Sequence, residues 1–484
     1  MQLSDIGVMG LAVMGENLAR NMLNHGFTVS VFNRNTSVTE HFEEQYGAQY
    51  PVFCAKTLED FLASLAKPRK IVMLIRAGEP VDQMIDRLIP MLDQGDCIID
   101  LGNSHYPDTI RRCEKVEAAG LLYVGSGVSG GGEGALLGPS MMPGGSPAAW
   151  PLIQPIFQAI CAKADGEPCC DWVGQGGAGH FVKMVHNGIE YGDMQLICEA
   201  YFLMKEYLGM DCDEMSKVFT QWNEGRLKSY LIEITADILT RKDEDGTPLV
   251  EKILDTAGQK GTGKWTTVAS LDEGIPLTLI SEAVFSRCLS AMKAERVAAA
   301  DVLGDEIVRF NGTEAEKEAF LVDLEAALYA SKIVSYTQGY NLMMSAAKTY
   351  GWDLNLGGIA LMWRGGCIIR SVFLGEIKNA FDENPSLPSL MTAPYFTEAL
   401  QKAAASWRKV CAAAIMAGVP APAFSSALSY YDGYRCPRLP ANLLQAQRDY
   451  FGAHTYERID APRGEFFHTD WTNIGSAASR TYNA

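Results

Sequence analysis

The N-terminal stretch of the chain constrains the fold more strongly than any other. An apolar run, Leu3–Met9, precedes a glycine turn; an amphipathic segment over 16–25 and a second apolar run, Phe27–Phe32, follow it. The turn consists of Gly10, Leu11, Ala12, Val13, Met14 and Gly15. A strand, a glycine turn, a helix and a second strand in this order predict a dinucleotide-binding unit of the Rossmann type, with Ala12 at the middle glycine position. The glycines let the backbone approach a pyrophosphate, whose charge is stabilised by N–H groups at the helix start.

The end of the second apolar run indicates which dinucleotide is bound. NAD enzymes place Asp or Glu there, to accept hydrogen bonds from the ribose 2′-hydroxyl. This chain has Asn33, Arg34 and Asn35 instead. A carboxylate would repel a 2′-phosphate, whereas a guanidinium pairs with it through two hydrogen bonds. We predict NADP as the cofactor, the alternative being that Arg34 is an ordinary surface arginine.

Composition and charge limit the classes of protein that remain. The net charge of −17 argues against a nucleic-acid partner, and any anionic substrate then requires a local basic pocket. Apolar runs fall short of the ~20 residues that span a bilayer, and the N-terminus lacks the pattern of a secretory signal, so we expect no membrane association. The 12 cysteines lack zinc-type spacing, which predicts reduced thiols, no metal site and a cytoplasmic protein.

The remaining patterns predict three regions. Strands alternate with helices up to about residue 177, which predicts a parallel sheet covered on both faces. The expected strands are Lys70–Ile75, Cys97–Leu101, Leu121–Val124, 141–144 and 171–173, and the expected helices are 81–92, 109–119 and one from Ala148. Residues 178–436 show mostly helical spacing and predict an all-α domain. Residues 437–484 form a C-terminal tail with one expected helix, Leu439–Tyr450.

The helical domain shows signs of an internal duplication. The first copy contains Gly209-Met210-Asp211, Trp222, Gly225, Ser229 and Glu233-Ile234. The second copy contains Gly351-Trp352-Asp353, Trp363, Gly366, Ser371 and Glu376-Ile377. The spacings agree to within one or two residues, which indicates a repeated helical unit, although so short a match leaves coincidence open. In the tail, we expect Phe466, Phe467 and Trp471 to pack on another surface, a partner subunit being one candidate.

A helix predicted to start near Ala178 carries a polar stripe where a cleft should follow the cofactor domain. The stripe contains Lys183, His186, Asn187, Glu190 and Tyr191. At ~100° per residue, Lys183, Asn187 and Glu190 lie within about 40° of one another. A solvent-facing stripe is the usual alternative. Gly188 and Gly192 interrupt the same helix, which indicates close approach of a ligand or a neighbouring backbone.

Two further segments follow predicted strands at the carboxyl end of the sheet, where open α/β folds bind ligands. Asn103 follows the strand Cys97–Leu101, and the loop Ser126–Gly134 follows the next strand. In that loop, Ser129, Gly130 and Gly131 present backbone N–H groups suited to a carboxylate, unless the loop is only a flexible turn.

The segment Gly258–Lys264 nearly matches a phosphate-binding P-loop. The next residue is Trp265, where Mg²⁺ binding requires Ser or Thr, and Val250–Ala257 before it has a helical pattern instead of a strand. These departures argue against an NTPase. A glycine-rich loop with Lys260, Thr262 and Lys264 is still suited to bind a phosphate without a metal.

The stretches Ile253–Trp265 and Leu439–His454 are highly specific, and with them the chain closely resembles the 6-phosphogluconate dehydrogenase family from end to end. The resemblance implies NADP-dependent oxidation of 6-phosphogluconate at C3 and loss of C1 as CO₂, giving ribulose 5-phosphate in the pentose phosphate pathway. It also implies that Lys183 is the general base and Glu190 the general acid.

The resemblance implies the remaining site residues as well. Substrate-binding positions match Asn103, Ser129, Gly130, Gly131, His186, Asn187, Tyr191, Lys260, Thr262, Arg287, Arg448 and His454. Cofactor-binding positions match residues 10–15 and 33–35, together with Arg76, Ala77 and Asn103. Family members are homodimers whose tail enters the neighbouring active site, so Arg448 and His454 would come from the other chain.

Two positions depart from the family pattern. Gly132 stands where relatives usually have glutamate, which puts the carboxylate loop in doubt, and Arg76 stands where many have lysine, which keeps the positive charge. Two other classes compete with this interpretation. A non-decarboxylating β-hydroxyacid dehydrogenase would lack the duplicated helices and the tail, and a silent NADP-binding sensor would lack Lys183 or Glu190.

Overall fold

A computed structural model describes residues 3–473 of the chain, which fall into two compact units that meet between Leu428 and Ser429. The first unit begins with an eight-stranded sheet in the order β10-β7-β6-β5-β4-β1-β2-β3. The strands are β1 (Ile6–Met9), β2 (Val29–Phe32), β3 (Val52–Ala55), β4 (Lys70–Met73), β5 (Cys97–Asp100), β6 (Leu122–Ser129), β7 (Ser140–Gly145) and β10 (Gly174–Gln175). The helices between them are α1 (Val13–Asn24), α2 (Thr36–Tyr46), α3 (Leu58–Ala63), α4 (Glu79–Leu88), α5 (Tyr106–Ala118), α6 (Gly131–Leu137) and α7 (Trp150–Ile160).

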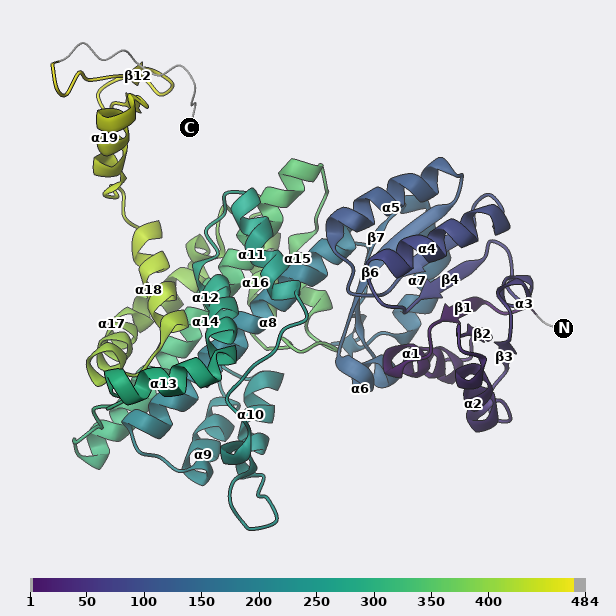
Figure 1. The fold of residues 1–484 in the computed structure, drawn as a ribbon, viewed down its shortest axis with the longest axis horizontal. Coiled ribbons are helices and arrows are strands. Elements are labelled where there is room, and N and C mark those ends of the chain that lie inside the picture. The colour runs from purple at the N-terminus through teal and green to yellow at the C-terminus, as the bar shows by residue number, and fades with distance from the viewer. Residues whose placement is uncertain (1–2, 474–484) are drawn as a thin grey trace. The chain divides into compact units, whose positions relative to one another are not determined.

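Both faces of this sheet are buried, as the alternation of side chains along each strand shows. In β5, Ile99 packs into one apolar cluster with residues of α1 and α7, whereas Ile98 packs into a second cluster with residues of α3, α4 and α5. Figure 1 shows α4 and α5 running along the sheet. The predicted Rossmann-type domain with helices on both faces is therefore confirmed.

The sheet differs from the prediction in its last strands. β6 continues to Ser129 instead of ending at Val124, and β7 pairs with it antiparallel, so the sheet is not wholly parallel. The reason is the short connection between them, since a parallel crossover needs a dozen or more residues. The last strand is β10, a few residues after the expected 171–173. β3, α2 and α3 were not predicted from the sequence.

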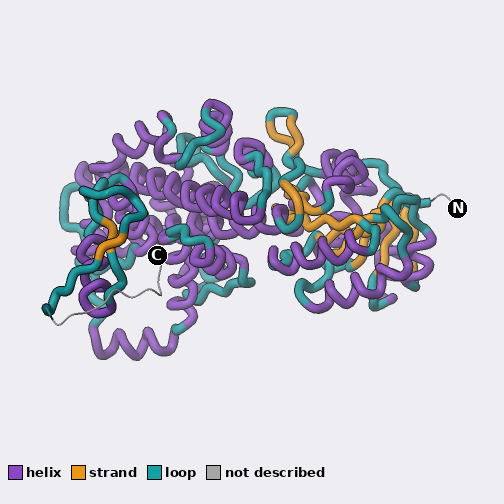
Figure 2. The backbone as a smooth tube through the Cα atoms, turned by 90° about the horizontal axis from the view of Figure 1, so that it is seen from above, coloured by secondary structure: helices purple, strands orange, loops and turns teal. Residues whose placement is uncertain are grey.

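A hairpin of β8 (Lys163–Ala164) and β9 (Glu167–Pro168) precedes β10, and residues 178–434 are then helical and form no strand. The helices are purple in Figure 2. The helices are α8 (Ala178–Phe202), α9 (Cys212–Trp222), α10 (Tyr230–Thr240), α11 (Thr262–Asp272), α12 (Thr278–Ala291), α13 (Lys293–Leu303), α14 (Glu314–Tyr350), α15 (Leu356–Met362), α16 (Leu374–Glu383), α17 (Pro394–Ala417) and α18 (Pro422–Tyr434), which runs into the second unit. Among residues 3–473, none of these helices has the length and apolarity needed to cross a membrane.

The duplicated sequence signature occupies equivalent places in two sets of helices. Trp222 ends α9 and Trp363 directly follows α15, and each of these short helices comes after a long one, α8 or α14. Ser229 and Ser371, which match in the two copies, face each other in an antiparallel bridge. Lys332 of α14 forms a buried ion pair with Asp193 of α8. The two long helices are thereby fixed together.

The prediction of a helix over Val250–Ala257 is wrong. Only a short 3₁₀ turn, Leu249–Lys252, forms there, and the chain then continues without helix up to α11. Asp255 pairs with Lys293 and Arg296, and the backbone N–H of Ala257 donates to the Ser290 hydroxyl. These contacts hold the segment against α12 and α13, so tertiary contacts override the local helical pattern.

The second unit contains the tail helix α19 (Ala441–Gly452) and a short hairpin of β11 (Tyr456–Glu457) and β12 (Phe466–Phe467). The helix lies two residues after its expected position. Phe466 is 53% exposed and Trp471 is 42% exposed in this single chain. The packing of these aromatic residues on another surface, such as a partner subunit, therefore stays a prediction.

Candidate active site

The turn between β1 and α1 is shaped by two glycines for which no other residue has space. Gly10 has φ +93°, and a Cβ there would lie 2.4 Å from the carbonyl oxygen of Leu74. A Cβ at Gly15 would lie 1.8 Å from the carbonyl oxygen of Gly10. Ala12 precedes the first turn of α1 and supplies no side-chain cap, so the N–H groups at the helix start remain available to an anion.

A cleft of about 540 Å³ lies beside this turn. Its lining includes Gly10, Ala12, Asn33, Arg34, Asn35, Arg76 and Arg87. Asn33 also accepts a hydrogen bond from the Leu11 N–H at 3.2 Å, which ties the end of β2 to the turn. Arg87, in the last turn of α4, was not predicted, because only the fold brings it to the cleft that Asn33–Asn35 line. The cleft therefore combines uncapped N–H groups with three exposed guanidinium groups, and its lining contains no carboxylate.

Lys183 lies on α8 and is buried against β6. A Cβ at Gly127 would lie 2.2 Å from the Cβ of Lys183, so glycine in the strand makes room for the lysine stem. Its Nζ lies 3.5 Å from Nδ1 of His186. Burial lowers the pKa of Lys183, and the nearby charge of Glu190 only partly opposes this shift. The site therefore favours a larger fraction of neutral amine than an exposed lysine would have.

His186 is fully buried one helical turn further along α8. Its Nε2 lies 3.4 Å from the Ser129 hydroxyl, and its Nδ1 lies 3.8 Å from Oε2 of Glu190. Burial, helped by the charge of Lys183, lowers the pKa of His186 well below its ordinary value. The imidazole is consequently neutral at neutral pH, with one nitrogen donating and one accepting.

Asn187 and Glu190 complete the polar face of α8. The Asn187 amide donates to Oε2 of Glu190 at 2.9 Å, while Oδ1 of Asn187 is buried without a partner among the described residues. An unpaired buried amide oxygen costs about 1–3 kcal/mol, which a ligand hydroxyl or N–H would recover. The orphan acceptor thus points to a ligand beside Lys183 and Glu190.

Gly188 and Gly192 of α8 are each approached by a side chain of a neighbouring helix. A Cβ at Gly188 would lie 2.7 Å from the side chain of Thr266, and a Cβ at Gly192 would lie 2.5 Å from the hydroxyl of Ser335. The neighbours that approach α8 are therefore the side chains of α11 and α14. A neighbouring backbone, which was one of the two predicted alternatives, is not what approaches these glycines, and the approach of a ligand stays a prediction.

The segment expected as a loop over Ser126–Gly134 is instead the end of β6 followed by the start of α6. Gly130 has φ +107°, and a Cβ there would lie 2.7 Å from the carbonyl oxygen of Gly366. Gly132 accepts a hydrogen bond from the side chain of Asn17, and a Cβ there would lie 2.9 Å from Val13. The Ser129 hydroxyl lies 3.4 Å from Nε2 of His186 on α8, and the binding of a carboxylate by Ser129–Gly131 stays a prediction.

The candidate phosphate site lies where α8, α11 and α12 meet. The Arg287 guanidinium lies 3.5 Å above the ring of Tyr191, and a Cβ at Gly263 would lie 2.5 Å from the same ring. Gly261, with φ +102°, precedes α11 and places Thr262 in its first turn. Lys260 is exposed on the preceding loop. The structure therefore brings Tyr191, Thr262 and Arg287 together, with Lys260 at the edge of the group.

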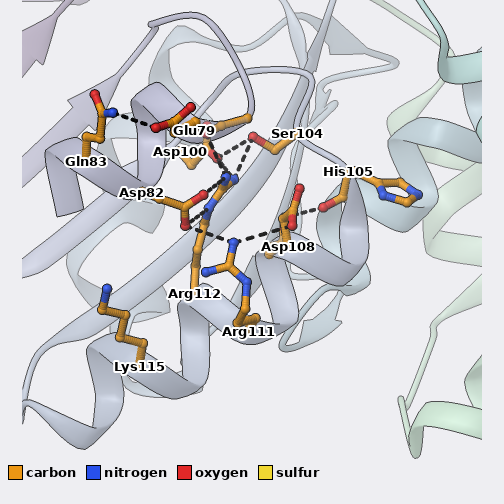
Figure 3. A network of polar contacts seen from close by, with 12 residues as sticks. Glu79, Asp82, Gln83, Asp100, Ser104, His105, Asp108, Arg111, Arg112 and Lys115 are labelled. Atoms are coloured by element: carbon orange, nitrogen blue, oxygen red, sulfur yellow. Dashed lines mark hydrogen bonds and ion pairs between the residues drawn. The ribbon is translucent and has the colours of Figure 1, made fainter. Parts of the chain in front are cut away.

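Asn103 is exposed on the loop after β5, and a buried network fixes that loop (Figure 3). Asp100 accepts from the Gly102 N–H at 3.0 Å and from the Ser104 hydroxyl at 2.6 Å. Arg112, fully buried on α5, donates to Ser104 and pairs with Asp82 of α4. The charged network thus holds the backbone on both sides of Asn103.

One site segment, over 363–367, was not predicted as such. Trp363 lies edge-on to His186, with ring centroids 5.5 Å apart, and the Gly366 carbonyl accepts from the Ser140 N–H. Cys367 is buried close enough to Lys183 to influence its pKa, and burial raises the pKa of the Cys367 thiol to about 12. Only the duplication signature marked Trp363 and Gly366, and it gave no indication that they flank the site.

The tail residues lie in the second unit and are described by themselves. Arg448 is half-buried on α19, where it donates to the Gln445 side chain at 3.0 Å, and His454 lies just past the end of that helix. In the part of the chain that the structure describes, no three potential metal ligands gather into a cluster.

The fold and the site together define a Rossmann-type dehydrogenase with a helical domain that carries a buried lysine. Two family models match nearly the whole chain. The model for the NAD binding domain of 6-phosphogluconate dehydrogenase matches residues 5–174, and that for the C-terminal domain of 6-phosphogluconate dehydrogenase matches residues 179–471. The chain belongs to the 6-phosphogluconate dehydrogenase family.

Individual relatives agree with the family models. The decarboxylating 6-phosphogluconate dehydrogenase of Rattus norvegicus is 58% identical to this chain, and that of Homo sapiens is 57% identical, each over 100% of both chains. Among solved structures, 6-phosphogluconate dehydrogenase of Plasmodium falciparum is 43% identical, with a TM-score of 0.93 over 96% of this chain and 100% of that one. That protein was solved in its apo form, with its cofactor NADP⁺ and with its substrate 6-phosphogluconate.

Proposed function

We propose that the chain oxidises 6-phosphogluconate at C3 and releases C1 as CO₂, giving ribulose 5-phosphate and NADPH. The observation that carries this proposal is the buried Lys183, whose pKa is lowered by burial and which lies near Glu190 on one face of α8. The names of the relatives and the ligands of the Plasmodium falciparum enzyme support the same reaction.

The residues of the first cleft fit NADP. The start of α1 suits the pyrophosphate, and Arg34, with Arg76 and Arg87 beside it, suits the 2′-phosphate. Asn33, Asn35, Ala77 and Asn103 complete the proposed contacts. When bound, NADP accepts the hydride that leaves C3. What the protein adds is orientation of the ring and positive charge at the phosphates.

Lys183 removes the proton from the C3 hydroxyl, which must leave as the C–H bond breaks. The ammonium that forms then hydrogen-bonds the new C3 ketone and polarises it. Because this ketone is β to the carboxylate, it accepts the electron pair released when C1 leaves as CO₂. His186, held neutral by its burial, is suited to hydrogen-bond substrate hydroxyls without adding a second cation beside Lys183.

Glu190 delivers a proton to the enediol carbon that has lost CO₂. Its carboxyl group is held by Asn187, whose unpaired Oδ1 is available to a substrate hydroxyl. One base and one acid on the same helix face therefore serve the two halves of the reaction. The N–H groups of Ser129–Gly131 are proposed to bind the carboxylate before it leaves.

The phosphate of the substrate is proposed to bind Tyr191, Lys260, Thr262 and Arg287. Arg448 and His454 are proposed to reach the same phosphate from the other chain of a homodimer. Leu443 and Phe451 of α19 are 63% and 73% exposed in the single chain, which supports coverage of the tail by a second subunit. We also propose that the chain has three domains, residues 1–177, 178–436 and 437–484, and that it is located in the cytoplasm.

One experiment tests the function as a whole. Purified protein is incubated with 6-phosphogluconate and NADP while NADPH and CO₂ are measured in the same sample, with NAD in parallel. Equal amounts of NADPH and CO₂, with little activity on NAD, are expected. NADPH without CO₂ would indicate a non-decarboxylating β-hydroxyacid dehydrogenase, and no NADPH at all would overturn the proposal.

A further inference from the structure

The turn that carries His454 has an unusual backbone. Ala453 and Thr455, on either side of His454, have φ +51° and +61°. Neither is glycine, and a β-branched residue such as threonine is rarely found in this left-handed region because its Cβ crowds the backbone. Such conformations cost of order 1–3 kcal/mol each and persist only where the surrounding structure determines them. Something in the tail must therefore hold this turn.

Asp449 is the first group that holds it. Its carboxylate is fully buried and accepts hydrogen bonds from the backbone N–H groups of Thr455 and Thr469, both at 3.0 Å. The Trp471 indole N–H and Nδ1 of His468 lie 2.9 Å from the same carboxylate. Burial acts to raise the pKa of Asp449, but these hydrogen bonds hold it below its ordinary value. An ionised carboxylate thus organises the chain from 455 to 471.

Gln445 is the second group, and it joins the turn to Arg448. Its amide nitrogen donates to the carbonyl oxygen of Thr455, while its amide oxygen accepts from the Arg448 guanidinium at 3.0 Å. Gln445, Arg448 and Asp449 are spaced i, i+3 and i+4, so they share one face of α19. Gly452 makes room for the imidazole, since a Cβ there would lie 2.4 Å from Nε2 of His454.

Arg448 is hydrogen-bonded to a neutral amide, which leaves its positive charge uncompensated. The adjacent Asp449 uses its two carboxylate oxygens on four other donors, and Arg448 is held by a neutral amide instead. A guanidinium held by an amide keeps its full attraction for a phosphate dianion, which a carboxylate partner would reduce.

We propose that Gln445 and Asp449 are positioning residues that set Arg448 and His454 in their substrate-binding geometry before substrate arrives. This inference rests on the proposed function, in which Arg448 and His454 bind the phosphate of 6-phosphogluconate. Fixing these side chains in advance lowers the entropy lost on binding, so the network acts on substrate affinity and not on the chemical step.

The test compares Asp449→Asn and Gln445→Leu with two controls of the same residue types at exposed positions, Asp460→Asn in the tail and Gln221→Leu near the end of α9. We expect the network variants to raise KM for 6-phosphogluconate about tenfold, equivalent to ~1.4 kcal/mol. Their kcat and their KM for NADP should stay within about twofold of the wild-type values. The reason is that the lost contacts bind the substrate equally in the ground state and in the transition state. The controls should keep wild-type constants.

Gln445→Glu separates charge from geometry. A glutamate oxygen still accepts from Arg448 but neutralises part of its charge, and it cannot donate to the Thr455 carbonyl. KM for 6-phosphogluconate should therefore rise at least as much as in Gln445→Leu. A wild-type KM in Gln445→Glu would contradict the role assigned to the neutral amide.

Mixed dimers distinguish positioning from general stabilisation of the tail. Asp449→Asn subunits are co-expressed with Lys183→Ala subunits under separate tags, and the mixed dimer is purified and assayed at low substrate. One of its two sites combines an intact Lys183 with an intact tail, so about half of the wild-type activity is expected, as for an Arg448→Ala and Lys183→Ala pair. A tail variant that only weakens the dimer would show dissociation in sedimentation with an unchanged KM.

The possible outcomes distinguish a failure of the positioning role from a failure of the proposed function. If the wild-type protein forms no NADPH from 6-phosphogluconate, the proposed function fails. If Arg448→Ala raises KM but Gln445→Leu and Asp449→Asn do not, the function stands and the positioning role is overturned. Should Asp449→Asn fail to dimerise, the two Gln445 variants decide.

Discussion

Helix α8 and the tail helix α19 both carry groups proposed to contact one substrate, but they hold those groups in different ways. On α8, Lys183 and His186 are buried, and burial shifts their pKa values. On α19, Arg448 is half-buried and is held through Gln445 to an irregular turn. Proton transfer by a lysine requires a lowered pKa, which depends on exclusion of water. A guanidinium is always charged, so it requires only the correct position. We therefore expect variants of α8 to change kcat and variants of the tail to change KM.

The largest effect is expected for Lys183→Ala. Loss of the general base should lower kcat by about 10³–10⁴, because positioned proton transfer contributes up to that much, while NADP still binds. Steady-state kinetics and calorimetric titration with NADP measure the two properties. Lys205→Ala, which removes a surface lysine paired with Glu251, serves as the control. Substantial residual turnover in Lys183→Ala would remove this residue from the base role.

The pH dependence of the wild-type enzyme follows from the same residue. The base acts only when it is deprotonated, so kcat/KM should rise with pH through the pKa of Lys183, which burial lowers from its ordinary value. The rise should be complete at a lower pH than an exposed lysine would allow. A pH profile of kcat/KM measures this, and a rise only near the ordinary lysine pKa would contradict the burial argument.

How far these features were predictable depends on the distance along the chain between partners. The polar face of α8 was predictable because 3.6-residue periodicity is a local property, and the glycine turn at 10–15 was predictable for the same reason. The burial of Lys183 was not, since it depends on Gly127 in β6, 56 residues earlier in the printed sequence. Helix formation over Val250–Ala257 was wrongly predicted because Asp255 pairs with residues of α13.

The tail shows the same limit. Arg448 and His454 were assigned from the resemblance to the family, but nothing local marked Asp449 or Gln445 as their supports. The donors to Asp449 are 6 to 22 residues away in irregular chain, where no periodicity exists to be recognised. Residues that act by holding a loop are consequently found from contacts and not from patterns.

A smaller effect, still on kcat, is expected for Gly127→Ala. The new Cβ would lie 2.2 Å from the Cβ of Lys183 and must displace it. A misplacement of about 1 Å costs roughly 10² in rate, so kcat should fall about 100-fold. Gly375→Ala is the control, because a Cβ there meets nothing within 4 Å. A wild-type kcat in Gly127→Ala would show that turnover does not depend on the observed position of Lys183.

Arg34→Glu tests the rule that exposed guanidinium groups set KM. The variant should raise KM for NADP by about 10–100-fold, since a hydrogen bond to a charged group contributes ~1.5–3 kcal/mol, and should shift preference towards NAD. Its kcat with saturating cofactor should change little. Arg241→Glu, an exposed arginine at the end of α10, controls for net charge. An unchanged ratio of kcat/KM for NADP and NAD would make Arg34 a plain surface residue.

The smallest effect concerns stability and lies at the opposite end of α8. Glu199 is buried there and accepts the backbone N–H groups of Ala423 and Phe424, at the start of α18. Burial raises the pKa of Glu199 to about 7, above its ordinary value of 4.5. The folded protein therefore binds this proton more tightly than the unfolded chain, and the free energy of unfolding should fall as pH rises from 4.5 to 7, by about 1–3 kcal/mol.

Glu199→Gln removes the titrating group, so the difference in unfolding free energy between variant and wild type should shift in favour of the variant across that pH range, measured by urea denaturation. Glu233→Gln, at an exposed position of α10, should show no such trend. A difference independent of pH would mean that Glu199 stays ionised when buried, and burial on α8 would then tune only the groups around Lys183.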